Sequence, residues 1–141
     1  SRNETVVELR DVMPTLLGLA GATMPERPLD GADFSGVVLR GESLSERPLF
    51  WASLGNNGAR AEAMREGPWK LVVQHPRARP GTFENETAEL YRLSDDPLEE
   101  RDLAGQHPER VAQMLARLKG WYKDTQRTAT PQKGGWPETE R

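Results

Sequence analysis

The chain has 141 residues, of which 29% are charged and 35% are hydrophobic, and its formal net charge is −3 at pH 7. This length suits one domain with a modest core, and the apolar residues occur in runs that are typical of a globular chain rather than a disordered one. The negative charge disfavours a nucleic-acid binder, which normally carries a strongly basic face, and no apolar run approaches the roughly 20 residues of a membrane span.

The N-terminal part of the chain predicts a strand, a helix and a loop. Residues 5–9 (TVVEL) favour one short strand, and Asp11 suits the N-cap of a helix over VMPTLLGLAG that Gly21 ends. This helix has little polar surface, so we expect another part of the protein to cover it. Residues 24–46 are rich in proline, glycine and acidic residues, which favours a connecting loop.

Four short segments predict the strands of an antiparallel sheet. Two of them are joined by Glu-Gly-Pro at 66–68, which is typical of a hairpin turn. In the second strand of this hairpin Trp69 shares a face with Leu71 and Val73, so Trp69 is predicted to anchor the core. The neighbouring Lys70 is expected to lie on the other side of the strand. The predicted strands are 47–54, 60–65, 69–74 and 89–93.

The clearest periodicity lies in residues 108–123, where apolar side chains recur at steps of three and four on one helix face. The acidic stretch at 95–102 lacks the spacing and the glycine of an EF-hand, which favours a structural turn over a calcium loop. The complete pattern predicts an α+β fold, in which a small antiparallel sheet of about four strands packs against a C-terminal amphipathic helix and follows a short helix. The apolar face of the C-terminal helix comprises Val111, Met114, Leu115, Leu118, Trp121 and Tyr122.

Several kinds of active site lack their residues in this sequence. The chain has no cysteine, which excludes a thiolate nucleophile or a thiolate metal site, and its two histidines, His75 and His107, each precede a proline. It has no G-x-S-x-G elbow, no H-E-x-x-H pair and no Gly-rich phosphate loop. Composition and spacing therefore favour a binding or structural unit.

Four pieces of the sequence carry a family resemblance through their order and spacing, although none is specific alone. They are D-x-x-P-T-L-L from Asp11, L-D-G at 29–31, R-x-G-x-W-K-L from Arg65, and L-Y-x-L-x-x-D-P-x-E from Leu90. Over residues 5–123 the chain resembles the C-terminal third of a sulfatase of the arylsulfatase type, in the alkaline-phosphatase-like superfamily.

The resemblance implies a longer parent enzyme that hydrolyses sulfate esters and is periplasmic or secreted. Such enzymes use a formylglycine, made from the first residue of Cys/Ser-x-Pro-x-Arg, and a calcium ion held by Asp and Asn side chains. Neither motif occurs here, so this chain is expected to be inactive alone and to have no catalytic, metal or cofactor site of its own. Its implied partner is the catalytic domain that precedes it in the family.

The resemblance also suggests where this piece approaches a substrate. Asn56, Asn57 and Arg60 lie in and beside the loop that approaches the active-site cleft in relatives, with ordinary turn chemistry as the alternative. Arg77 and Arg79 form a second candidate for polyanion binding, with a solvated loop as the alternative. Amide groups and an arginine fork suit sugar hydroxyls or a sulfate. Some relatives carry an acidic residue and a histidine after the Phe-Trp strand, whereas Ala52 and Ser53 stand here, so that histidine's role does not transfer.

The predicted organisation has four parts. Residues 1–29 resemble the end of the missing catalytic domain, 30–46 connect, 47–126 form the C-terminal subdomain, and 127–141 form a flexible tail. Without the catalytic domain, the apolar surface of residues 5–21 is expected to detach, to repack or to mediate self-association. The alternative function is a free-standing module that binds sulfated glycans or a protein partner.

Overall fold

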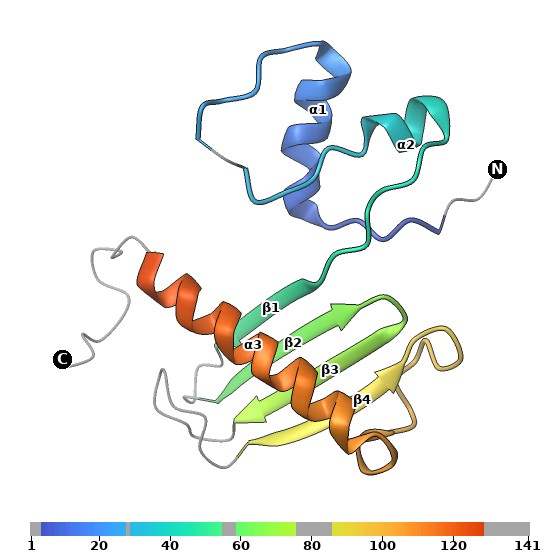
Figure 1. Cartoon of the computed structure of the whole chain (residues 1–141), viewed down its shortest axis with the longest axis vertical. Coiled ribbons are helices and arrows are strands. Elements are labelled where there is room, and N and C mark those ends of the chain that lie inside the picture. Colours follow the sequence, from blue (N-terminus) through green and yellow to red (C-terminus); the bar gives the residue numbers. More distant parts are fainter. Residues whose placement is uncertain (1–3, 28, 55–58, 76–85, 129–141) are drawn as a thin grey trace. The chain divides into compact units, whose positions relative to one another are not determined.

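The computed structural model of the protein describes residues 4–27, 29–54, 59–75 and 86–128 (Figure 1). The chain divides into two compact units, Ser1–Glu46 and Arg47–Arg141, which we call unit 1 and unit 2. Residues 55–58, residues 76–85 and the part of the predicted tail from 129 to 141 lie outside the described residues, whereas residues 127 and 128 of that tail end a helix.

Unit 1 contains a 3-10 turn, η1 (Leu9–Asp11), and two helices, α1 (Val12–Ala20) and α2 (Ser35–Arg40). The predicted helix is confirmed, and it ends as expected at Gly21, whose φ of 62° lies in the left-handed region that glycine adopts without strain.

The predicted strand at 5–9 is wrong. A strand needs a neighbour to satisfy its backbone groups, and no described residue of unit 1 pairs with this segment. Instead, the Asp11 carboxylate accepts a hydrogen bond from the Glu8 backbone N–H at 2.8 Å, which closes the chain into η1. The local turn therefore replaces an extended conformation.

The prediction of a connecting loop at 24–46 is wrong for Ser35–Arg40, which form α2. The Asp33 carboxylate accepts a hydrogen bond from the N–H of Ser35, the first residue of this helix, at 2.7 Å. Gly41, at φ 69°, ends the helix in the left-handed region. With only six residues, the helix is too short to show a clear periodicity.

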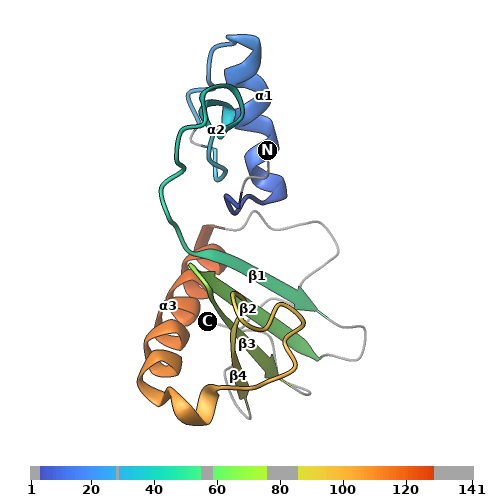
Figure 2. The same cartoon turned by 90° about the vertical axis from the view of Figure 1, so that its right-hand side faces the viewer.

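Unit 2 is the predicted four-stranded antiparallel sheet with a C-terminal helix, so the α+β fold is confirmed. The strands lie in the order β1-β2-β3-β4. Helix α3 (Pro108–Thr128) lies across one face of the sheet (Figures 1 and 2), and it extends past the predicted end at residue 123 because neither glycine nor proline interrupts that stretch. The strands are β1 (Leu49–Leu54), β2 (Arg60–Glu66), β3 (Trp69–His75) and β4 (Thr87–Arg92).

The core of unit 2 lies between the sheet and α3. Met64, Leu71 and Leu90 are aligned across β2, β3 and β4 and are fully buried, and Met114 and Leu118 of α3 cover them. Alternation along each strand determines which side chains join this core.

Trp69 is half-buried and packs against the core, as predicted. It follows a hairpin turn in which Gly67 adopts φ 55°, the conformation that the first central residue of a type II′ turn requires. On the other side of the strand, Lys70 bonds both carboxylate oxygens of Glu99 at 2.6 and 2.7 Å. The Trp-Lys pair therefore serves packing and surface pairing.

Candidate functional site

A group of ionisable side chains is buried at one end of the sheet in unit 2. Arg60 begins β2 and is the register partner of His75, which ends β3. Glu62 lies two positions after Arg60, on the same face of β2. Only 3% of Arg60, 1% of Glu62 and none of His75 is exposed. We call these three residues the buried triad.

Glu62 lies at the centre of the buried triad. One of its carboxylate oxygens forms an ion pair with the Arg60 guanidinium, and the other lies 2.7 Å from Nε2 of His75. From α3, the ring of Tyr122 contacts the guanidinium of Arg60, whose central carbon lies 4.7 Å from the ring centroid. Buried charges are tolerated only with such compensation, because each loses several kcal/mol of hydration on leaving water.

A second ion pair flanks the buried triad. Gln74 and Thr87 are register partners, so Glu86, just before β4, lies at the same end of the sheet as His75. Its Oε1 accepts a hydrogen bond from Nζ of Lys119 on α3 at 2.7 Å. The buried triad and the Glu86–Lys119 pair therefore lie at the same end of the sheet.

The sequence-predicted site residues are only partly described. Asn56, Asn57, Arg77 and Arg79 lie outside the described residues. Arg60 is described, and its guanidinium faces Glu62 and Tyr122. Sequence reasoning missed Glu62 and His75. Glu62 lies an even number of positions from Met64 on one strand, and His75 lies an even number from Leu71 on the next, which predicts that both face the core.

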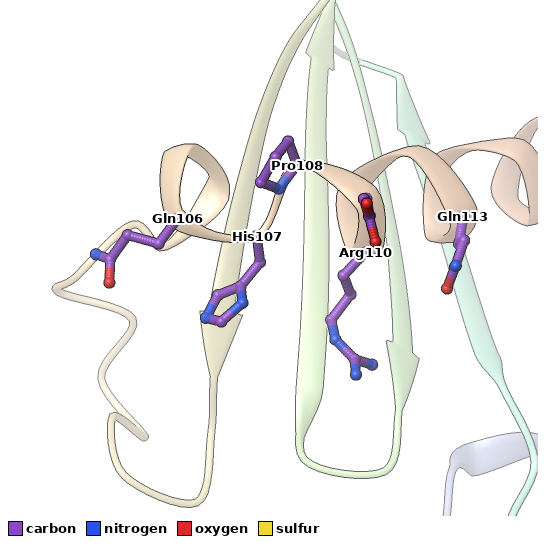
Figure 3. A pocket seen from close by; sticks show the side chains of 6 residues that line it. Gln106, His107, Pro108, Arg110 and Gln113 are labelled. Carbon is purple, nitrogen blue, oxygen red and sulfur yellow. The ribbon is translucent and has the colours of Figure 1, made fainter.

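A shallow polar hollow lies at the start of α3 (Figure 3), lined by Gln106, His107, Pro108, Glu109, Arg110 and Gln113. The guanidinium of Arg110 lies 4.7 Å from the Trp69 ring centroid, and the His107 ring meets Trp69 edge-on at 5.1 Å. The lining side chains are exposed, and they include no nucleophile with an activating base. The hollow thus lacks the features of a catalytic centre.

The described residues do not suit the calcium ion that the family resemblance implies for the parent. Among them, no three His, Asp or Glu side chains converge as metal ligands. Asp96, in the acidic stretch at 95–102, has a structural role. Its carboxylate accepts hydrogen bonds from the backbone N–H groups of Arg101 and Glu100 at 2.9 and 3.1 Å. These hydrogen bonds hold the pKa of Asp96 below its usual value.

Unit 1 exposes an apolar surface. Four apolar side chains of α1 are between 41% and 61% exposed, and two apolar side chains of α2 are each 63% exposed. Exposed apolar side chains that form one contiguous patch are a feature of surfaces that bind another protein part. Within the described part of the chain, no helix is long and apolar enough to cross a membrane. The exposed residues are Val12, Met13, Leu16 and Leu19 of α1 and Val38 and Leu39 of α2.

No protein-family model matches the chain. Solved structures with a similar fold include YidJ of Bacteroides fragilis, assigned as a sulfatase, with a TM-score of 0.63, 23% identity and coverage of 82% of this chain and 24% of that chain. The protein BT33336S-sulf, from work on glycosaminoglycan metabolism by Bacteroides thetaiotaomicron, matches with a TM-score of 0.57 and 24% identity. The match covers 80% of this chain and 24% of that protein. BT4656, solved with its substrate D-glucosamine-2-N,6-O-disulfate, matches with a TM-score of 0.61 and 19% identity. The match covers 81% of this chain and 24% of that protein.

These likenesses establish the fold. The neighbours are sulfatases, and this chain matches their C-terminal portion, as the order of its sequence motifs predicts. The chain spans about a quarter of the length of these neighbours, 24% in each case.

Proposed function

We propose that this chain acts as the non-catalytic C-terminal subdomain of a sulfatase, whose remaining part carries the nucleophile and the metal. The observation that carries the proposal is the match of 82% of this chain to 24% of a sulfatase chain, at a TM-score of 0.63. The lack of cysteine agrees with it, since formylglycine formed from cysteine would have to lie elsewhere. In such a parent, the calcium and formylglycine implied by the resemblance would belong to the catalytic part.

Unit 1 would then pack against that catalytic part. Its exposed residues Met13 and Leu16 on α1 and Val38 and Leu39 on α2 are apolar side chains of the kind that domain interfaces bury. Residues 1–29 would complete the catalytic domain, as the resemblance implies. In the isolated chain, the same surface would mediate self-association.

The substrate class that fits best is a sulfated sugar. BT4656 takes a sulfated glucosamine, and BT33336S-sulf belongs to work on glycosaminoglycan metabolism. The Asn56, Asn57, Arg77 and Arg79 side chains offer amide and guanidinium groups that suit sugar hydroxyls and sulfate. Arg60 is buried at the start of β2, so it would contribute through the position of this strand end rather than by direct contact.

The test compares hydrolysis of an aryl sulfate and of D-glucosamine-2-N,6-O-disulfate by this chain and by the full-length gene product. Calcium and a formylglycine-generating enzyme are supplied to both. Turnover by the full-length product alone is the expected result. Turnover by this chain alone would refute the assignment of the chemistry to another part. Sugar binding by this chain, with no turnover by either protein, would favour the free-standing binding module.

A parallel measurement tests the interface role of unit 1. Sedimentation of the isolated chain is expected to show self-association, which Leu16→Gln together with Leu39→Gln should weaken. Both side chains are exposed, so the substitutions leave the packing inside unit 1 intact. A monomeric wild-type chain at all concentrations would contradict the prediction of self-association.

A further inference from the structure

We propose that Asp11 and Thr15 are positioning residues, which fix helices α1 and α2 as one rigid element so that their exposed apolar side chains dock together on the remaining part of the parent chain. The inference deepens the proposed function and rests on it for the identity of that partner. The connection between the two helices stands on the described residues of unit 1 alone.

Unit 1 distributes its polar and apolar side chains in an unusual way. Helices α1 and α2 lie side by side in it (Figures 1 and 2). Among the described residues of this unit, the buried side chains are those of Asp11, Thr15 and Ser35, together with Pro14. No leucine, valine, methionine or phenylalanine described there is buried, and six such side chains on the two helices are exposed. Polar contacts therefore have a large part in holding the helices together, which leaves the apolar side chains available for a partner.

Two side chains at the start of α1 make these polar contacts. The Asp11 carboxylate accepts one hydrogen bond on each oxygen, from the backbone N–H groups of Glu8 and Ala32, both at 2.8 Å. The Thr15 hydroxyl donates to the C=O of Asp11 at 2.6 Å and accepts from the N–H of Phe34 at 3.1 Å. Phe34 is the N-cap of α2, so this bond reaches the start of the second helix. We call the bonds from Asp11 to Ala32 and from Thr15 to Phe34 the polar bridge.

Close backbone packing supports the polar bridge. Gly31 lies so close to the chain before α1 that a Cβ at this position would collide with the carbonyl oxygen of Arg10. The next turn is fixed by Asp33, whose carboxylate accepts a hydrogen bond from the N–H of Ser35 at 2.7 Å. Because Asp11 is fully buried, losing one of its partners would leave an unpaired polar group away from water. We therefore expect α1 and α2 to move as one element.

The size of the apolar surface favours a partner in the same parent chain. A stable complex between separate proteins generally buries about 800 Å², or roughly 20–30 residues, on each side. This surface offers six exposed apolar side chains on two short helices, so a second copy would bind it weakly. A covalently linked part acts at an effective concentration on the order of 1 mM, for which a small surface suffices. This chain covers 24% of each neighbouring sulfatase, which leaves room for such a part in the parent.

The first test measures whether the polar bridge fixes the two helices relative to each other in the 141-residue chain. The chain has no cysteine, so spin labels on Ala20→Cys and Arg40→Cys, two exposed helix ends, report the distance between α1 and α2. An excess of unlabelled chain removes distances between copies. In Asp11→Asn the distance distribution is expected to become at least twice as wide at constant helix content, because the amide has one acceptor oxygen for two N–H donors. An unchanged distribution would overturn the proposal.

The matched control is Asp30→Asn, which makes the same change at an exposed aspartate of unit 1. It should leave the distribution as in the wild type, and equal broadening would overturn the proposal. If Asp11→Asn loses its helices, Thr15→Val decides, because valine keeps the shape of threonine and lacks only the hydroxyl. Thr15→Val should broaden the distribution, whereas Thr23→Val, at an exposed position, should not. Loss of helix in Thr15→Val as well would reduce both residues to helix stabilisers and refute a positioning role.

The second test concerns the partner and uses the full-length gene product. Met13 belongs to the apolar surface and is 61% exposed, so its oxidation by hydrogen peroxide reports whether another part covers it. Relative to a methionine peptide in the same sample, Met13 is expected to oxidise at least tenfold more slowly in the full-length product than in the dilute 141-residue chain. Asp11→Asn in the full-length product should restore at least threefold of this loss, and Asp30→Asn should restore none. Equal protection in Asp11→Asn and the wild type would refute the role of the polar bridge in docking.

The remaining outcomes separate the possible partners. An unchanged Met13 rate in the full-length product would show that the rest of the parent does not cover α1, and would overturn the proposal. Protection found only in the isolated chain, and growing with its concentration, would assign the surface to a second copy and would overturn it too. A full-length product that protects Met13 but hydrolyses no sulfate ester would refute the sulfatase assignment and leave the docking role of Asp11 and Thr15 intact.

Discussion

The core of unit 2 makes a quantitative prediction at Leu118. This side chain is fully buried, and it belongs to the cluster with Met64, Leu71, Val73 and Leu90. Leu118→Ala removes three carbon atoms from a site enclosed by both sheet and helix, where Leu-to-Ala changes cost about 2–5 kcal/mol. Because domains of this size hold only about 5–15 kcal/mol of stability, the variant should lose a large share of it.

Thermal unfolding is the assay for Leu118→Ala. Each kcal/mol of lost unfolding free energy lowers Tm by roughly 4–8 °C in a domain of this size. A loss of about 3 kcal/mol should therefore lower Tm by about 10–25 °C. Near-UV circular dichroism reports on the core directly, since Phe50 and Trp121 stack with centroids 5.1 Å apart and rings inclined by 7°. Leu98→Ala is the control, because that side chain is 76% exposed and its loss should cost under about 0.5 kcal/mol. Equal shifts in the two variants would refute the assignment of this face as the core.

Two further predictions concern the turn after β4. Glu99 adopts φ 59°, which is unfavourable for a residue other than glycine, and its carboxylate is held by Lys70. In urea unfolding, Lys70→Met should lower the free energy of unfolding by about 0.5–1 kcal/mol. Adding Glu99→Gly to this variant should raise it again by up to about 1 kcal/mol. A further loss in the double variant would contradict this account. The pKa of Asp96 is lowered by N–H groups of Arg101 and Glu100, so its stabilisation is complete above its unfolded pKa of about 3.9 and is lost as pH falls through the lower folded pKa. The urea midpoint of Asp96→Asn should therefore fall less than that of the wild type between about pH 5 and pH 2, and equal falls would rule this carboxylate out.

Local signals predicted most of the fold. The turn at Gly67 is specified by neighbouring residues, and the apolar stripe that includes Met114 and Leu118 spans several turns of α3, so both are visible in sequence. The strand predicted at 5–9 failed because a strand exists only with a partner. Helix α2 was missed because its six residues, between the Asp33–Ser35 hydrogen bond and the stop at Gly41, are too few for a period to appear.

The candidate site was harder to predict because it depends on pairing between strands. Asn56 and Arg60 look alike in sequence, as polar residues near a turn. Register separates Arg60 from its neighbours, since its partner across the sheet is His75. Only when β2 and β3 are aligned do the three ionisable side chains of the buried triad prove to be close together.

Alternation along the strands explains why those side chains are buried. Met64 and Leu71 must face α3 to form the core, and a period of two then places Glu62 and Arg60 on the same face of β2 and His75 on that of β3. Their burial therefore follows from the core, and their mutual pairing makes it tolerable. An anion could reach the Arg60 guanidinium only if the side chains that cover it moved, because only 3% of Arg60 is exposed. A role for Arg60 in substrate binding is consequently more favourable through the position of the β2 end than through direct contact.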